Sequence, residues 1–261
     1  MTRTIFSLLI FQTLFLLALD PPEWKPIEAG MEIAQYMSPE VVFVRVNPDL
    51  FEFKLYSASI QGGCRTARNW AEDEGLSVVT NAGMYQEDGH TSVGFLKQGQ
   101  HRVNAHWAST YNAVLVFSPT RAIDGKSVKI LDRTCSDLTD IEQTYDVLVQ
   151  NYRLIDCRGQ NTWSPSEKQW SMALLAQDTE GNILFIFTRT PFSTHNFIQV
   201  LRRLPLQLNR GMYLEGGKEA TLYVRAKDLV IEKVGAFGSS QESKPNMKAW
   251  PVPNLIGIKR R

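Results

Sequence analysis

The sequence predicts an α+β fold: a large, twisted, mixed but mainly antiparallel β-sheet, flanked by a few helices in a single domain. Short apolar runs rich in β-branched residues are numerous, whereas only two segments have the apolar spacing and end signals of helices. Turn signals such as Asn47-Pro48-Asp49 separate neighbouring runs, which favours hairpins. With 261 residues, 43% hydrophobic and 21% charged, the chain can bury a substantial core.

The predicted strands are short runs of β-branched and aromatic residues. They cover 41–46, 51–58, 76–80, 112–117, 172–178, 182–188, 221–225 and 229–234, with a final strand at 254–260. One helix is predicted over 65–75, where Gly75 provides a stop signal. A second is predicted over 193–204, with Ser193 or Thr194 as its cap and an apolar face.

Residues 1–18 are predicted to direct export. Arg3 precedes a nearly uninterrupted apolar run from Ile5 to Leu19, which suits a secretory signal and falls short of a bilayer span. An uncleaved N-terminal anchor is the alternative, and it is the one membrane contact that the sequence predicts. We expect a secreted or periplasmic protein with a proline-rich linker over 19–39 and a functional domain over 40–261.

Charge and cysteine content narrow the functional classes. The formal net charge is +1 and the longest basic run is Lys259 to Arg261, so nucleic acid is not an expected partner. Three cysteines in an oxidising compartment predict one disulfide and one free thiol. We favour Cys135 with Cys157 because both flank the same predicted segment. The cysteine spacing fits no zinc pattern.

Two junctions between strands and turns carry the candidate chemistry. In "VVTNAGMY", Asn81 follows an apolar strand, where its amide can point at a ligand, and Gly83 allows a sharp turn or a close approach. The alternative is that Asn81 caps its own turn. In "MYLEGGKEATLYV", Glu215 ends a strand beside Gly216 and Gly217, whose amides would favour an anion. The alternative there is a glycine hairpin with a solvent-exposed Glu.

The order and spacing of several motifs resemble one family. These are "TNAGMYQEDGHTSVGFLKQGQ", "YNAVLVF", "VQNYRLID", "ALLAQDTEGNILFIFTRTPFSTHNFIQVLRRL" and "GMYLEGGKEATLYV". Together they resemble the phosphodiester glycosidase family over roughly residues 40–258. The resemblance implies hydrolysis of a sugar that is linked through its anomeric carbon to phosphate.

That chemistry suits the two junctions. A phosphate is already a good leaving group, so the enzyme mainly binds phosphate, stabilises positive charge on the sugar and positions or deprotonates a water. Glu215 is the expected catalytic carboxylate, and Asn81 would hold a sugar hydroxyl or a phosphate oxygen. Gly216, Gly217 and Lys218 would receive the phosphate.

Further candidates lie outside the junctions. His195 and Asn196 begin the second predicted helix, where anions are attracted, and His195 is a candidate acid or base; a surface or capping role is the alternative. Asp88 and His90 could line the same cleft, although Asp88-Gly89 is also an ordinary turn pair. Two tryptophans of one loop, Trp163 and Trp170, are expected substrate contacts.

The chain also departs from the family pattern. Many members have an Arg before the strand that includes Met172, where this chain has Trp170 and Ser171, and Lys168 is the nearest cation. Many have Asp-Gly-Gly-Gly-Ser where this chain has Glu-Gly-Gly-Lys-Glu. A non-catalytic phosphoglycan-binding envelope protein is therefore the second hypothesis. No cofactor is predicted, and the sequence leaves a divalent cation undecided because no oxygen-ligand loop is recognisable.

Overall fold

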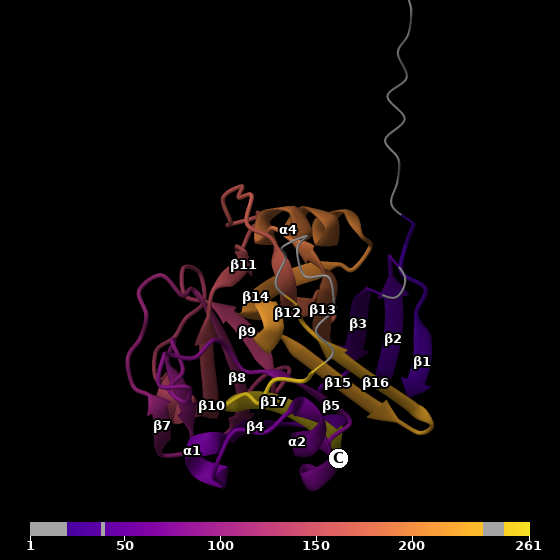
Figure 1. The fold of residues 1–261 in the computed structure, drawn as a ribbon. Helices are drawn as coiled ribbons and strands as arrows, with labels where there is room; N and C mark the ends of the chain where they lie inside the picture. The colour runs from indigo at the N-terminus through magenta and orange to yellow at the C-terminus, as the bar shows by residue number, and fades with distance from the viewer. Residues whose placement is uncertain (1–19, 38–39, 237–247) are drawn as a thin grey trace, which may run out of the picture.

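The structure is a computed structural model that describes residues 20–37, 40–236 and 248–261. The predicted export signal over 1–18 lies outside the described residues. Three sheets, in which every pairing between described strands is antiparallel, surround a common interior (Figure 1). The predicted class, an α+β domain built on antiparallel strands, is confirmed, and the predicted sheet is divided into three.

The largest sheet has seven strands. In spatial order they are β1 (Lys25–Glu28), β2 (Met31–Tyr36), β3 (Val41–Val46), β13 (Ile183–Phe192), β12 (Trp170–Asp178), β14 (Leu208–Gly216) and β11 (Arg153–Ile155). β1 and β2 correct the linker predicted over 19–39. A turn at Gly30, with a φ of 75°, lets this segment form a hairpin, and β2 pairs along its whole length with β3 while Met31 and Ile33 enter the core.

The other two sheets have five strands each. One has the order β7 (His101–Asn104), β6 (Leu96–Gln98), β10 (Tyr145–Asn151), β8 (Ala113–Pro119) and β9 (Lys129–Asp132). The other has the order β16 (Leu229–Val234), β15 (Thr221–Ala226), β5 (Val78–Asn81), β17 (Asn254–Arg260) and β4 (Phe51–Ser57). All nine predicted strands form, with ends that shift by a few residues.

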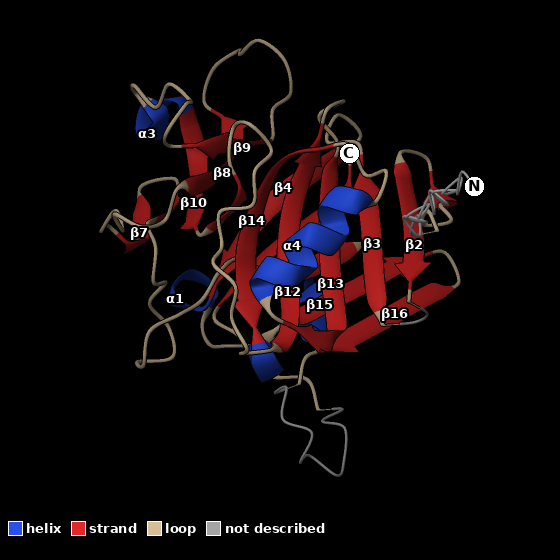
Figure 2. Cartoon of the chain, turned by 90° about the horizontal axis from the view of Figure 1, so that it is seen from above, coloured by secondary structure: helices blue, strands red, loops and turns tan. Residues whose placement is uncertain are grey.

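One hydrophobic core joins the three sheets, and helices cover two outer faces. The core includes Phe185 from the first sheet, Leu115 from the second and Ile256 from the third. Figure 2 shows α4 (Thr194–Arg203) crossing the seven-stranded sheet, where Phe197 and Leu201 are buried. α2 (Ala67–Glu74) covers the sheet that contains β5. Both helices match the predicted segments.

Three further helical segments are short. They are α1 (Ala58–Gln61), α3 (Ile141–Thr144) and the 3-10 turn η1 (Gly217–Glu219). In the described part of the chain, no helix combines the length and the apolar character needed to cross a membrane.

A disulfide and an ion pair join β9 to β11, and thus the second sheet to the first. The predicted Cys135–Cys157 disulfide is present, with 6.5 Å between its Cα atoms, and Cys64 is free. Beside it, Arg153 Nη1 donates to both carboxylate oxygens of Asp132 at 2.8 Å. Asp132 is 1% exposed, so this pair is shielded from water.

Replacing both disulfide cysteines, as Cys135→Ser with Cys157→Ser, should destabilise the protein. The two cysteines are 22 residues apart in the sequence. Closing a loop of that size lowers the conformational entropy of the unfolded chain and so stabilises the folded protein by about 3 kcal/mol. Urea unfolding should show a loss of this order, whereas Cys64→Ser should change the free energy of unfolding by under about 1 kcal/mol. A double variant that unfolds at the wild-type midpoint would contradict the role given to the disulfide.

Candidate active site

The two junctions singled out in the sequence meet in the structure. β5 pairs with β15, the strand that follows the Glu215 junction, with Thr80 opposite Leu222. At the end of β5 the Asn81 amide bridges to the other junction: its Nδ2 donates to the carbonyl of Glu219 at 2.9 Å, and its Oδ1 accepts from the Thr221 N–H at 2.8 Å. Segments far apart in the sequence are therefore held at one place.

Asn81 holds this junction by its side chain. The residue is 1% exposed, and both ends of its amide are engaged by backbone groups of the η1–β15 segment. Two roles were expected for the Asn81 side chain from the sequence, a contact with a ligand or a cap on its own turn. The observed contact is a third arrangement, in which the amide satisfies buried backbone groups of a remote turn.

Glu215 lies where β14 ends beside β12. Glu215 pairs with Ala173 and Tyr213 pairs with Leu174, so Leu214 is an extra residue that forms a bulge in β14. A bulge changes the direction of the side chains next to it, and here it directly precedes the candidate acid. Glu215 is 8% exposed, and its Oε1 accepts from the N–H of Gly216 at 2.9 Å.

Burial dominates the acidity of Glu215. Desolvation raises its pKa from 4.5 to about 8; the bond from Gly216 N–H opposes this rise, and the nearby charge of Glu219 adds to it. No described residue forms a salt bridge with Glu215. The sequence predicted a carboxylate here, whereas burial keeps much of this group protonated at neutral pH.

Three tyrosines that were not predicted as site residues lie close enough to Glu215 for its charge to raise their pKa values. Burial, followed by the charges of Glu219 and Glu215 among other causes, raises the pKa of Tyr85 to about 12. Burial raises the pKa of Tyr111 and Tyr213 as well, and the charge of Glu215 adds to both. The sequence does contain a signal for two of them, because Tyr85 and Tyr213 each follow Gly-Met in a junction motif.

The glycines of the two junctions are required for close packing. A Cβ at Gly216 would lie 2.0 Å from Tyr213 Oη and 2.7 Å from the indole of Trp170. Gly217 has a φ of 69°, in the left-handed region. Gly83 has a φ of 149°, and a Cβ there would lie 2.6 Å from Asn151 Oδ1. The predicted close approach at Gly83 is made to a protein side chain.

Lys218 lies at the outer edge of this junction. Its ammonium is 4.0 Å from the centre of the Trp250 ring and 3.8 Å from a carboxylate oxygen of Glu219. About a third of the Lys218 side chain is exposed, and Tyr85 is also only partly buried. The junction therefore reaches the protein surface on the side of Lys218 and Tyr85.

The helix residues proposed from the sequence hold a loop. His195 Nδ1 donates to the Trp163 carbonyl at 2.5 Å, and Asn161 Nδ2 donates to the His195 carbonyl at 3.0 Å. Asn196 is exposed, and its N–H donates to the Ser193 cap at 3.3 Å. No hydrogen bond or ion pair joins His195 to Glu215 within the described residues. His195 thus connects α4 to the Trp163 loop.

The remaining candidates also have local structural contacts. Asp88 accepts bonds from the N–H groups of His90 and Thr91 and from the Thr91 hydroxyl, which lower its pKa to about 2. This is the turn arrangement given above as the alternative for Asp88. The His90 ring contacts the Cys64 thiol at 3.7 Å. Lys168 is exposed in the loop before β12.

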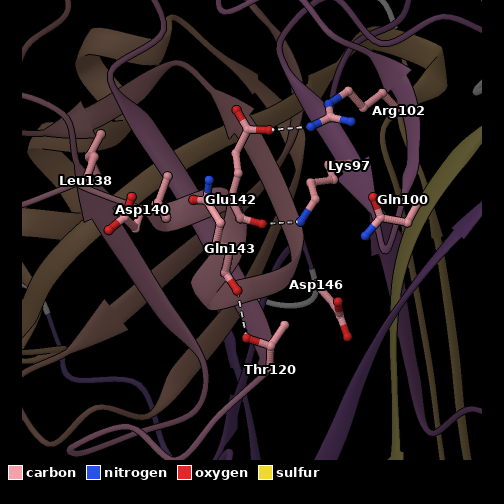
Figure 3. Close-up of a pocket in the computed structure, with 10 residues that line it drawn as sticks. Lys97, Gln100, Arg102, Thr120, Leu138, Asp140, Glu142, Gln143 and Asp146 are labelled. Carbon is pink, nitrogen blue, oxygen red and sulfur yellow. Dashed lines mark hydrogen bonds and ion pairs between the residues drawn. The ribbon is translucent and has the colours of Figure 1, made fainter.

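A polar pocket of about 550 Å³ lies away from this junction, among β6, β7 and α3 (Figure 3). Both of its cationic side chains are engaged: Lys97 Nζ donates to the Glu142 and Tyr145 carbonyls, and Arg102 pairs with the Glu142 carboxylate at 2.8 Å. These contacts fix the end of α3. We therefore place the candidate site at the Glu215 junction.

Potential metal ligands are grouped elsewhere. Among the described residues, the group of three that could hold an ion is Asp132, Cys135 and Cys157. Its two sulfur atoms are joined in the disulfide, and the carboxylate is paired with Arg153. This group is therefore part of the connection between β9 and β11.

Comparison with known proteins supports one family. The family model for phosphodiester glycosidases matches residues 74–259. No curated protein sequence matches this chain. One similar solved structure is a hypothetical protein from Synechocystis, with a TM-score of 0.61 and 14% identity over 93% of this chain and 64% of that chain. This chain thus spans just under two thirds of that protein's length.

A second solved structure is the catalytic domain of zebrafish N-acetylglucosamine-1-phosphodiester alpha-N-acetylglucosaminidase, auto-inhibited by its pro-peptide. The TM-score is 0.59 and the identity is 11%, over 92% of this chain and 82% of that chain. At these identities the two structures demonstrate a shared fold.

Removing the Asn81 amide should lower the free energy of unfolding of the protein. Asn81→Ala leaves the Thr221 N–H and the Glu219 carbonyl without their partner, and each buried unsatisfied group costs about 1–3 kcal/mol. We expect urea unfolding to show a loss of about 2–4 kcal/mol. Asn209→Ala, at an exposed asparagine of β14, is the matched control and should cost under about 0.5 kcal/mol. Equal stability of the two variants would contradict the bridging role.

The acidity of Glu215 predicts how stability depends on pH. Between pH 4.5 and about 8 the folded protein keeps a proton that the unfolded chain has released, so stability falls as pH rises through this window. Glu215→Gln does not titrate, so its stability relative to wild type should rise by a few kcal/mol between pH 5 and pH 8.5. Urea unfolding at several pH values measures this difference. Parallel curves would show that Glu215 ionises normally, and Glu180→Gln should follow wild type.

Proposed function

The chain belongs to the phosphodiester glycosidase family, and we propose that it is a hydrolase acting on a sugar-1-phosphodiester in an extracytoplasmic glycan or glycoconjugate. One observation supports this above the others: Glu215 is a buried carboxyl without a salt bridge to any described residue. Burying such a group costs stability, and perturbed carboxyls of this kind are concentrated at catalytic sites. Its position in the family's glycine motif agrees with that role.

The protonated form of Glu215 supplies an acid and then a base. As the bond between the anomeric carbon and the phosphate oxygen breaks, its electron pair leaves with the phosphate, which takes the Glu215 proton. The resulting carboxylate stabilises the positive charge that develops on the sugar ring. Water then adds to the anomeric carbon and returns a proton to Glu215. The products are the free sugar and a phosphate monoester.

The surrounding groups suit a phosphodiester. Tyr85, Tyr111 and Tyr213 have raised pKa values, so their hydroxyls stay protonated and can donate to phosphate oxygens. Lys218 supplies positive charge at the open edge of the junction. Asn81 and the glycines hold the backbone that carries these groups. A protonated Glu215 also lets an anionic substrate approach without repulsion.

Two features support an extracytoplasmic location and a glycan partner. The Cys135–Cys157 disulfide is typical of an oxidising compartment, and the apolar run at the N-terminus has the length of an export signal. We propose a carbohydrate or phosphoglycan as the partner, with no nucleic acid. The membrane is contacted at most through an uncleaved N-terminal segment.

A non-catalytic phosphoglycan-binding protein is the second candidate. Where many family members have an Arg, this chain has Trp170 and Ser171, and Ser171 Oγ is engaged by backbone groups, donating to the Arg189 carbonyl and accepting from the Ala236 N–H. No guanidinium is therefore supplied from this position. Such a protein would bind the same ligands and release no sugar.

The decisive measurement is sugar release from a panel of sugar-1-phosphate methyl diesters. Wild type should turn over at least one, with kcat/KM falling about tenfold per pH unit above pH 8, because the protonated acid is the active form. Glu215→Gln should lower kcat by a factor of about 10²–10⁴ with little change in affinity, while Glu180→Gln stays at the wild-type rate. Binding without release by wild type would favour the second candidate; release at the wild-type rate by Glu215→Gln would exclude Glu215 as the acid.

A further inference from the structure

A second pocket lies beside the Glu215 junction and has no role in the chemistry proposed above. It has a volume of about 290 Å³, at the lower limit of ordinary small-molecule pockets. Its lining combines two aromatic rings, a guanidinium, hydroxyls and an amide, from Tyr152, Trp163, Arg153, Thr110, Thr162 and Asn112. The β11 strand and the loop that follows it form one wall, and the segment leading into β8 forms the other.

A continuous set of aromatic contacts connects this pocket to Glu215. Trp163 lies 5.4 Å, between ring centres, from Tyr213, which is two residues before Glu215 in β14. The ring centres of Tyr152 and Tyr111 are 4.1 Å apart. Burial raises the pKa of Tyr111, and Tyr152 and the charge of Glu215 add to this rise. The pocket is thus separated from the candidate acid by one layer of rings.

Trp163 is held rigidly as a platform. Its indole Nε1 donates to the Arg153 carbonyl at 2.8 Å, and its backbone N–H donates to Asn161 Oδ1 at 3.0 Å. Its own carbonyl accepts from His195 Nδ1 at 2.5 Å. The ring nevertheless remains only partly buried. A fixed, partly exposed indole is the surface on which the apolar face of a sugar ring stacks, and its rigidity lowers the entropic cost of binding.

Arg153 gives the pocket polar character without a net positive charge. Its Nη1 is engaged by the buried Asp132 carboxylate and by the Thr134 hydroxyl, each at 2.8 Å. No hydrogen bond engages its Nη2 in the part of the chain that the structure describes. Because Asp132 already neutralises the guanidinium, the pocket favours hydroxyl groups over a phosphate. Thr110 and Asn112 supply further hydrogen-bonding groups on the opposite wall.

We propose that this pocket is an accessory carbohydrate subsite that binds one neutral sugar ring stacked on Trp163. This rests on the proposed function in one respect, namely that the ring belongs to the same glycan whose phosphodiester reaches Glu215. The preferred substrate then carries at least one sugar beyond those joined by the phosphodiester. His195 is a positioning residue of this subsite, through its bond to the Trp163 carbonyl.

Direct binding tests the subsite without turnover. Isothermal titration with trisaccharides of glucose, mannose, galactose, rhamnose and N-acetylglucosamine should give millimolar or tighter binding for at least one. Thr110→Phe fills the pocket from an exposed position and should weaken that binding at least tenfold, whereas Thr139→Phe, on an exposed turn elsewhere, should not. Absence of binding by the whole panel, or equal binding by both variants, overturns the proposal. If wild type bound inorganic phosphate and Thr110→Phe weakened that binding at least tenfold, the pocket would be an anion site and the proposal would be overturned.

Turnover separates this proposal from the proposed function. With an extended phosphodiester that carries the bound trisaccharide, Thr110→Phe should raise KM at least tenfold and leave kcat unchanged. With a single-sugar methyl diester, the same variant should keep the wild-type kcat/KM within about twofold. Single-sugar hydrolysis combined with no KM effect on the extended substrate would overturn the subsite and leave the hydrolase intact. Trisaccharide binding with no hydrolysis of any diester would keep the subsite and overturn the hydrolase.

Discussion

The arrangement of the candidate site depends on one buried amide. Asn81 satisfies the Glu219 carbonyl and the Thr221 N–H, and so fixes the end of β5 to the turn after β14. That turn contains two adjacent glycines, which by themselves leave the backbone many conformations. A buried donor and acceptor that find their partners in one side chain select a single conformation among these. The position of Glu215 relative to the rings around it follows from that selection.

The same packing gives Glu215 its chemical character. The bulge at Leu214 lies where β14 leaves its regular pairing with β12, and the Glu215 that follows it is only 8% exposed. Without a cationic partner in the described chain, the protonated form is favoured. The protein therefore keeps a group whose ionisation opposes folding. Such a cost is common where a carboxyl must hold a proton near neutral pH.

Short-range patterns in the sequence predicted most strands and both longer helices, because those elements have clear apolar runs and end signals. β1 and β2 were predicted as linker because prolines precede β1 and one, Pro26, lies within it. Their pairing with each other and the pairing of β2 with β3 show that they are strands. β6 and β7 have three and four residues, too few to show a period. The resemblance to the family implied that the two junctions lie together, and the bonds from Asn81 to the backbone of Glu219 and Thr221 do hold them together. The direction of the Asn81 amide could not be predicted, because its Thr221 partner lies 140 residues away in the sequence. In the same way, no residue near His195 in the sequence indicates its bond to the Trp163 carbonyl.

The departures from the family pattern differ in their consequences. Asn81 binds backbone groups at 219 and 221, so the side chains at 218 and 219 can change without disturbing the junction. In this chain the Lys218 ammonium lies over the Trp250 ring, at the open edge of the junction. Gly216 has no such freedom, because Tyr213 and Trp170 occupy the space of a side chain. The change from Asp to Glu at 215 is different again, because it moves the carboxyl itself by one methylene at a buried position. The changes at 218 and 219 therefore alter the surface at the open edge of the junction, whereas the change at 215 alters the position of a buried carboxyl.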